Sequence, residues 1–146
     1  MNRILFLLFP AGLALASEWP QAVGPNGNFV SAGEAPDAFS VSKNEAVRWR
    51  AKLPSTGQGT PVVSGGRVFV TSHDEITKGS QTGSSILGMC FDARTGKELW
   101  RRKIGGTRTT DLSSLFSDNT AASPVADGKR VVFVNVGGTV KCFDYE

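Results

Sequence analysis

An internal repeat limits the possible folds of this chain more than any other feature. Residues 60–70 (TPVVSGGRVFV) return at 123–134 (SPVADGKRVVFV) with one residue inserted. Two further landmarks recur after a similar interval: Trp49 returns as Trp100, and the tripeptide Cys-Phe-Asp at 90–92 returns at 142–144. Landmarks that share a spacing of about fifty residues indicate a repeated structural unit.

The repeated unit consists of short strands separated by turn residues. In the first unit, strands are expected at 60–64, 67–72, 86–92 and 97–103. Gly65-Gly66 is a favoured two-residue hairpin turn, and Gly96 suits a turn that requires positive φ. Units of about fifty residues built from four short strands are typical of β-propeller blades. The sequence therefore predicts an all-β fold of four-stranded antiparallel blades, the first at 60–103.

About two blades fit into this chain. Three strands of a second, incomplete blade are expected at 122–126, 130–136 and 139–144, within residues 121–146. Residues 17–45 form an irregular lead-in rich in Gly, Pro, Asn and Ser. Residues 46–53 are predicted as a lone strand that matches the fourth strand of the repeat through Trp49. Because a closed propeller needs about four to eight blades, we expect the N-terminal part of a larger propeller, whose uncovered surfaces lead to self-association.

The first sixteen residues have the order of features found in a signal peptide. Asn2-Arg3 supplies a positive end, residues 4–16 are apolar, and Ala14-Leu15-Ala16 forms a small-x-small cleavage site. We therefore expect residues 1–16 to be removed on export to the periplasm or the medium. An uncleaved anchor is the alternative, and no transmembrane segment is predicted after the cleavage site.

The distribution of charge narrows the range of binding partners. The formal net charge is +3, and the basic residues are scattered apart from Arg101-Arg102-Lys103. We interpret this triplet as a solvated strand face, so no nucleic-acid partner is predicted.

Cys90 and Cys142 occupy the same position in successive blades. Because packed sheets lie about 10 Å apart, too far for a disulfide, we expect two free and buried thiols.

Residues 90–100 (CFDARTGKELW) resemble the repeat of the secreted PQQ-like β-propeller proteins, which ends in Asp-x-x-Thr-Gly-Lys-x-x-Trp. These proteins are related in fold to the quinoprotein alcohol dehydrogenases, which carry pyrroloquinoline quinone (PQQ), and to outer-membrane assembly lipoproteins of the BamB type. The opening Trp19-Pro20-Gln21 is similar to the start of mature family members. The resemblance implies structural roles in the blades for six residues: Trp49, Asp92, Thr95, Gly96, Trp100 and Asp144.

Two functions stay open under this resemblance. Quinoprotein dehydrogenases hold PQQ over Ca²⁺, use a catalytic Asp and often carry adjacent cysteines, whereas this sequence has no adjacent cysteines and no Cys-x-x-Cys-His haem motif. No residue here can be matched to the catalytic, cofactor or metal positions of that family. The first hypothesis is therefore an exported, non-catalytic scaffold that binds a protein partner or further blades at the cell envelope. The alternative is part of a PQQ-dependent oxidoreductase, and only this alternative implies PQQ with Ca²⁺.

Three polar residues are candidates for binding a ligand. His73 is the single histidine and begins the polar trio His73-Asp74-Glu75, where a strand leads into an inserted loop. Loops at the ends of propeller strands are where binding residues gather. Asp118 and Asn119 lie in the connector between the blades, which could border a central channel.

Overall fold

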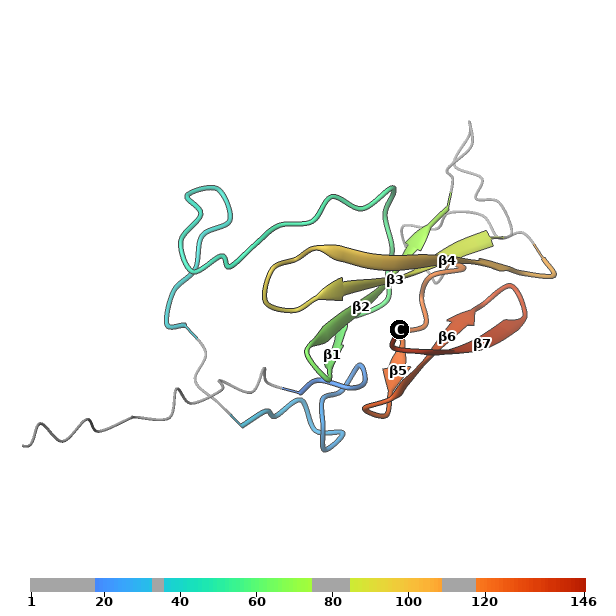
Figure 1. The fold of residues 1–146 in the computed structure, drawn as a ribbon, viewed down its shortest axis with the longest axis horizontal. Helices are drawn as coiled ribbons and strands as arrows, with labels where there is room; N and C mark the ends of the chain where they lie inside the picture. The colour runs from blue at the N-terminus through green and yellow to red at the C-terminus, as the bar shows by residue number, and fades with distance from the viewer. Residues whose placement is uncertain (1–17, 33–35, 75–84, 109–117) are drawn as a thin grey trace, which may run out of the picture.

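The computed structural model describes residues 18–32, 36–74, 85–108 and 118–146, so the predicted signal peptide lies outside the described residues. Figure 1 shows that the described chain forms two antiparallel sheets lying side by side. The first sheet, called blade 1, has the order β1 (Val62–Ser64), β2 (Arg67–His73), β3 (Ser85–Asp92) and β4 (Glu98–Gly105). The second, called blade 2, has the order β5 (Val125–Ala126), β6 (Arg130–Asn135) and β7 (Thr139–Asp144). The all-β fold of propeller blades is thus confirmed.

Turn chemistry fixes the hairpins of blade 1. Gly65 and Gly66 both have positive φ, 56° and 71°, as the tight turn between β1 and β2 requires. After β3, Asp92 Oδ1 accepts hydrogen bonds from Thr95 N and Thr95 Oγ1, both at 2.7 Å, and from Arg94 N at 3.1 Å. Gly96 follows with a φ of 72°. Side-chain bonds of this kind hold a turn without help from the rest of the fold.

The main core lies between the two blades. It joins buried residues of blade 1 with buried residues of blade 2: Val62, Phe69, Ile86, Cys90 and Ile104 with Ala126, Val131 and Phe133. Trp100, Phe143 and Tyr145 pack against this cluster, and the rings of Phe69 and Tyr145 are 4.8 Å apart between centroids. Gly88 of β3 leaves room for Phe133, because a Cβ added there would lie 3.1 Å from the phenyl ring.

A second cluster covers the opposite face of blade 1. Leu87, Met89 and Phe91 alternate along β3 with residues of the main core and are also buried. Ala51 and Leu53 from the preceding segment pack on them, together with Val68 and Val70 of β2. Strand β3 is therefore buried on both faces, as expected for an inner strand of stacked blades.

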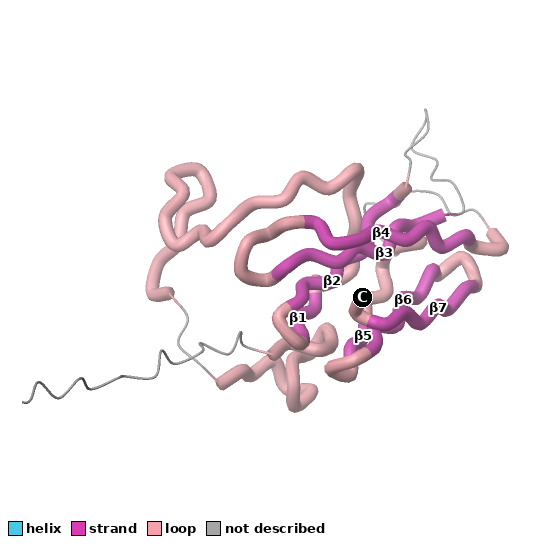
Figure 2. Tube along the Cα trace, in the orientation of Figure 1, coloured by secondary structure: helices cyan, strands magenta, loops and turns pink. Residues whose placement is uncertain are grey.

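Residues 46–53 are not a strand, contrary to the prediction. Although they pack on blade 1, they belong to neither sheet, and Figure 2 shows this part of the chain as loop. The reason is physical: a strand is defined by hydrogen bonds to a neighbouring strand, and no described strand lies beside this segment. Trp49 is nevertheless held, since its indole Nε1 donates to Ala93 O at 2.8 Å.

The lead-in connects the blades near their first strands. Trp19 exchanges two backbone hydrogen bonds with Val63 of β1, at 2.7 and 2.8 Å. The next residue, Pro20, accepts a hydrogen bond from Ala126 N of β5 at 2.8 Å. Residues 18–20 therefore tie β1 to β5.

The two cysteines differ in burial. Both thiols are free, but Cys90 is buried whereas Cys142 is exposed, so the prediction of two buried thiols is wrong for Cys142. Cys90 lies on β3 between β2 and β4, and it belongs to the core that blade 2 covers. Cys142 lies on β7, which in the described chain pairs only with β6. Burial raises the pKa of the Cys90 thiol to about 11. In the described residues, no helix has the length and apolar character needed to cross a membrane.

Candidate functional site

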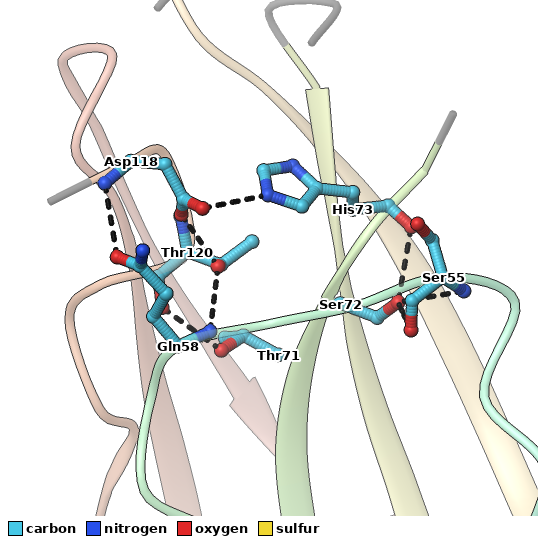
Figure 3. Close-up of polar contacts among 7 residues, drawn as sticks. All are labelled: Ser55, Gln58, Thr71, Ser72, His73, Asp118 and Thr120. Atoms are coloured by element: carbon cyan, nitrogen blue, oxygen red, sulfur yellow. Dashed lines mark hydrogen bonds and ion pairs between the residues drawn. The ribbon is translucent and has the colours of Figure 1, made fainter. Parts of the chain in front are cut away.

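The structure brings His73 and Asp118 together where the blades meet (Figure 3). His73 is the last residue of β2, and Asp118 lies in the connector before β5. His73 Nε2 and Asp118 Oδ2 are 2.9 Å apart, and the two residues are 0% and 1% exposed. Asn119 is buried beside them, and its carbonyl accepts a hydrogen bond from Val136 N at 3.2 Å. We call the buried set His73, Asp118, Asn119 and Thr120 the junction cluster.

The second oxygen of Asp118 organises the connector. Asp118 Oδ1 accepts from Thr120 N and from Thr120 Oγ1, both at 2.7 Å. Thr120 Oγ1 in turn accepts from Gln58 N at 2.9 Å, and Asp118 N donates to Gln58 Oε1 at 3.1 Å. The carboxylate is thus satisfied at both oxygens, as a buried charge must be.

The loop before β1 closes the junction cluster from one side. Ser72 Oγ donates to Ser55 O at 3.2 Å, and His73 N donates to Thr56 O at 2.8 Å. Gly57 lies so close to β2 that an added Cβ would be 2.3 Å from Thr71 O. The loop therefore contacts β2 of blade 1 through its backbone and the connector of blade 2 through Gln58 (Figure 3).

Two opposing effects act on the pKa of Asp118. Burial alone would raise this pKa, but hydrogen bonds from Thr120 and from His73 stabilise the carboxylate and hold the pKa below its usual value. Asp118 is therefore ionised at neutral pH. His73 Nδ1 is buried, and no described residue provides it with a hydrogen-bond partner.

Burial limits the chemical reactions in which the junction cluster can take part. A His–Asp pair can position a proton, but neither side chain is accessible to a substrate in this conformation. Over the residues that the structure describes, no three His, Cys, Asp or Glu side chains gather as they would around a metal ion.

Sequence reasoning found His73, Asp118 and Asn119 as separate candidates but missed Gln58 and Thr120. Thr120 carries a signal, since Asp118-Asn119-Thr120 places a hydroxyl two residues after a carboxylate, a spacing that favours a local side-chain bond. No sequence signal marks Gln58, because its hydrogen-bond partners are about sixty residues away in sequence and only the packing of the blades brings them near.

A second region of interest lies on the outer side of blade 2. A groove of about 280 Å³ on this side is lined by Val125, Ala126, Asp127, Arg130, Val132 and Cys142. Val125 and Val140 are 52% and 64% exposed, although both are apolar strand residues. By the repeat, Val125, Val132 and Cys142 correspond to Val62, Phe69 and Cys90, which blade 2 covers in the main core.

The same tryptophan contact occurs at both blades. Trp100 Nε1 donates to Tyr145 O at 2.9 Å, and Trp49 Nε1 donates to Ala93 O at 2.8 Å. Tyr145 and Ala93 both follow the Cys-Phe-Asp tripeptide by one residue. Each Trp therefore fixes its own segment to the end of the third strand of the next blade.

Comparison with protein families gives two matches along the chain. A family model described as outer membrane protein assembly factor BamB matches residues 11–84 and again residues 80–146. Comparison with curated proteins and with solved structures gave no significant match.

Proposed function

This chain belongs to the family of PQQ-like repeat proteins described as outer membrane protein assembly factor BamB, and on that premise we propose that it is an exported, non-catalytic β-propeller module that binds protein at the cell envelope. The observation that carries the proposal is the side of blade 2 that no described residue covers, where Val125 and Val140 are exposed. Edge strands and apolar faces left open in this way are surfaces for other polypeptides. The occupants we propose are protein partners or further propeller blades.

The junction cluster supports a structural role for the candidate ligand residues. His73, Asp118 and Thr120 direct their hydrogen bonds at each other and at the loop before β1. Polar groups used in this way hold two blades in one relative orientation. The Asp118 carboxylate, the group in the cluster best suited to acid–base chemistry, thus already uses both oxygens in hydrogen bonds that stabilise the fold.

Export is the second part of the proposal. The predicted signal peptide at 1–16 and a family description that names outer-membrane assembly both favour the cell envelope. We propose the periplasm or the extracellular medium as the site of action. We propose no nucleic-acid partner, because the basic residues are scattered along the sequence apart from Arg101-Arg102-Lys103.

The test separates a scaffold from an oxidoreductase. The full chain, expressed with its leader and a C-terminal tag in a Gram-negative host, is expected in the periplasmic fraction in a shortened form. The purified protein, given PQQ, Ca²⁺ and primary alcohols, is expected to reduce no electron-accepting dye, with a quinoprotein dehydrogenase as the positive control. Dye reduction that depends on both PQQ and this protein would overturn the non-catalytic assignment, and retention of the leader in the cytoplasm would overturn export.

A further inference from the structure

We propose that residues 39–52 dock this protein on a membrane surface that carries anionic lipid headgroups. Phe39 and Val41 enter the layer between the headgroups and the acyl chains, and three cations contact the lipid phosphates: Lys43, Arg48 and Lys52. Interfacial membrane anchors combine an apolar part with a row of cations in this way. The inference goes beyond the proposed binding of protein and does not depend on it.

The apolar part of the surface is carried by a short hairpin in the lead-in. Ser40 and Glu45 exchange two backbone hydrogen bonds, at 3.1 and 3.0 Å, and Asn44 N donates to Val41 O at 3.3 Å across the turn. Lys43 N also donates to Ser40 Oγ at 3.2 Å. This segment, from Ser40 to Glu45, we call the lead-in hairpin. Its shape is held by its own hydrogen bonds, without support from either sheet.

Two apolar side chains project from this part of the chain. Phe39 directly precedes the lead-in hairpin and is 70% exposed, and Val41 in its turn is 58% exposed. Figure 1 shows the segment in cyan, standing away from both sheets. A fluid lipid interface deforms around a protruding apolar tip, whereas a protein partner has to supply a groove of matching shape. The protruding position therefore favours a lipid occupant.

The charged part of the surface is the outward side of the segment that follows. Ala51 and Leu53 pack on blade 1, and the alternate positions are exposed cations: Arg48, Arg50 and Lys52. Among the described residues, none forms an ion pair with these three side chains. Residues 39–52 contain four basic residues and one acidic residue, Glu45, which leaves a net charge of +3. Cations of this kind complement anionic headgroups, at about fivefold in affinity for each Lys or Arg.

Arg50 connects the apolar part to the charged part. Its guanidinium nitrogen Nη2 donates a hydrogen bond to the carbonyl of Val41 in the turn. Because Arg50 belongs to the outward row of cations, this bond places the lead-in hairpin on the same side of the segment as that row. One flat membrane surface can therefore meet the apolar tip and the cations together.

The first test measures co-sedimentation of the mature chain, residues 17–146, with vesicles of phosphatidylcholine that contain about one third phosphatidylglycerol. The wild-type chain is expected to bind these vesicles at least about tenfold more tightly than vesicles of phosphatidylcholine alone, and to dissociate in about 0.5 M salt. Lys43→Gln with Arg48→Gln is expected to weaken binding about tenfold or more, and so is Phe39→Ser with Val41→Ser.

Two control variants change the same residue types elsewhere. Phe29→Ser with Val30→Ser removes a similarly exposed apolar pair, and Lys129→Gln with Lys141→Gln removes two exposed cations near blade 2. Both are expected to bind like wild type, and all variants to keep the wild-type circular dichroism spectrum. Absence of binding, equal binding to neutral vesicles, or hairpin variants that bind like the controls would overturn the proposal. Retention on immobilised poly-glutamate without vesicle binding would also overturn it and would assign the surface to an acidic polypeptide.

The second test examines insertion of the apolar tip. In a Cys142→Ser background, Val41→Cys is labelled with an environment-sensitive fluorophore. Its emission is expected to rise and to shift to shorter wavelength on addition of the anionic vesicles, whereas the same label at Val30→Cys is expected to show no change. Vesicle binding without a change at residue 41 would overturn insertion. Both tests use purified protein, so their failure can be told apart from a failure of the proposed export or of the non-catalytic assignment.

Discussion

At the scale of single residues, the Asp118 carboxylate accepts hydrogen bonds from His73 and twice from Thr120 in a site closed to water. Asp118→Ala leaves those donors buried and unpaired. We expect it to lower the free energy of unfolding by about 3 kcal/mol or more in urea titrations.

Asp127 provides the matched control for Asp118. Its carboxylate accepts two backbone hydrogen bonds, from Lys129 N at 3.0 Å and Arg130 N at 2.7 Å, but its side chain is 53% exposed. Water can replace a carboxylate there, so Asp127→Ala is expected to lower the free energy of unfolding by only about 1 kcal/mol. Equal losses for the two variants would show that the junction cluster does not hold the blades.

Gly57 is a second residue whose environment permits little change. Its added Cβ would meet the carbonyl of Thr71 at 2.3 Å, a backbone atom that cannot move without shifting β2. We expect Gly57→Ala to lower the free energy of unfolding by about 1–3 kcal/mol. Gly105, where an added Cβ meets nothing within 4 Å, is the control, and Gly105→Ala is expected to change stability by less than about 0.5 kcal/mol. A Gly57→Ala protein as stable as wild type would contradict the close approach of the loop to β2.

At the scale of elements, β3 and β7 share a sequence motif but differ in what covers them. Cys142 on β7 is expected to react with a thiol reagent in the native protein, whereas Cys90 on β3 reacts only after denaturation, because burial protects it and raises its pKa to about 11. Counting modified thiols by mass spectrometry, with Cys142→Ser as the control, gives the assignment. Rapid native labelling of Cys90 would contradict the packing between the blades.

Asp118, in the connector between the blades, is expected to make the stability of the fold depend on pH in a known direction. Because the folded-state pKa of Asp118 is held below its unfolded value, the carboxylate stabilises the fold above the ordinary Asp pKa of about 4, and this contribution is lost as the pH falls through the lower folded-state pKa. Stability in urea is therefore expected to decrease from neutral pH toward acid. Asp118→Asn should show a shallower decrease, and identical slopes for both proteins would rule out this residue as the source.

The elements also show where sequence reasoning succeeded. The glycine turn at 65–66 and the Asp92 turn depend on local residues, so the hairpins of blade 1 could be predicted from the sequence alone. Residues 46–53 were predicted as a strand and are not one, because alternation shows which face is apolar but not whether a partner strand is present. The pairing of His73 with Asp118 was out of reach for a similar reason, since it depends on how two blades pack.

At the scale of the whole molecule, the two blades are joined by apolar packing in the middle, by the junction cluster and by the lead-in. Trp19 and Pro20 connect β1 and β5, and the loop that contains Gln58 contacts both β2 and the connector. Contacts from several separate segments favour one cooperative unit over two independent blades. A single unfolding transition by both fluorescence and circular dichroism is therefore expected, and two separated transitions would contradict it.

The contact of Trp49 with Ala93 also has a consequence during synthesis. Strands within each blade follow one another in sequence, so each blade can form soon after its residues leave the ribosome. Trp49, Ala51 and Leu53 are made earlier, but their binding surface exists only once the turn at Ala93 has been made. At the usual rate of chain elongation, about forty residues take roughly 2 to 8 s. For that interval the nascent chain exposes an apolar segment, which is the period in which a chaperone would have to protect it.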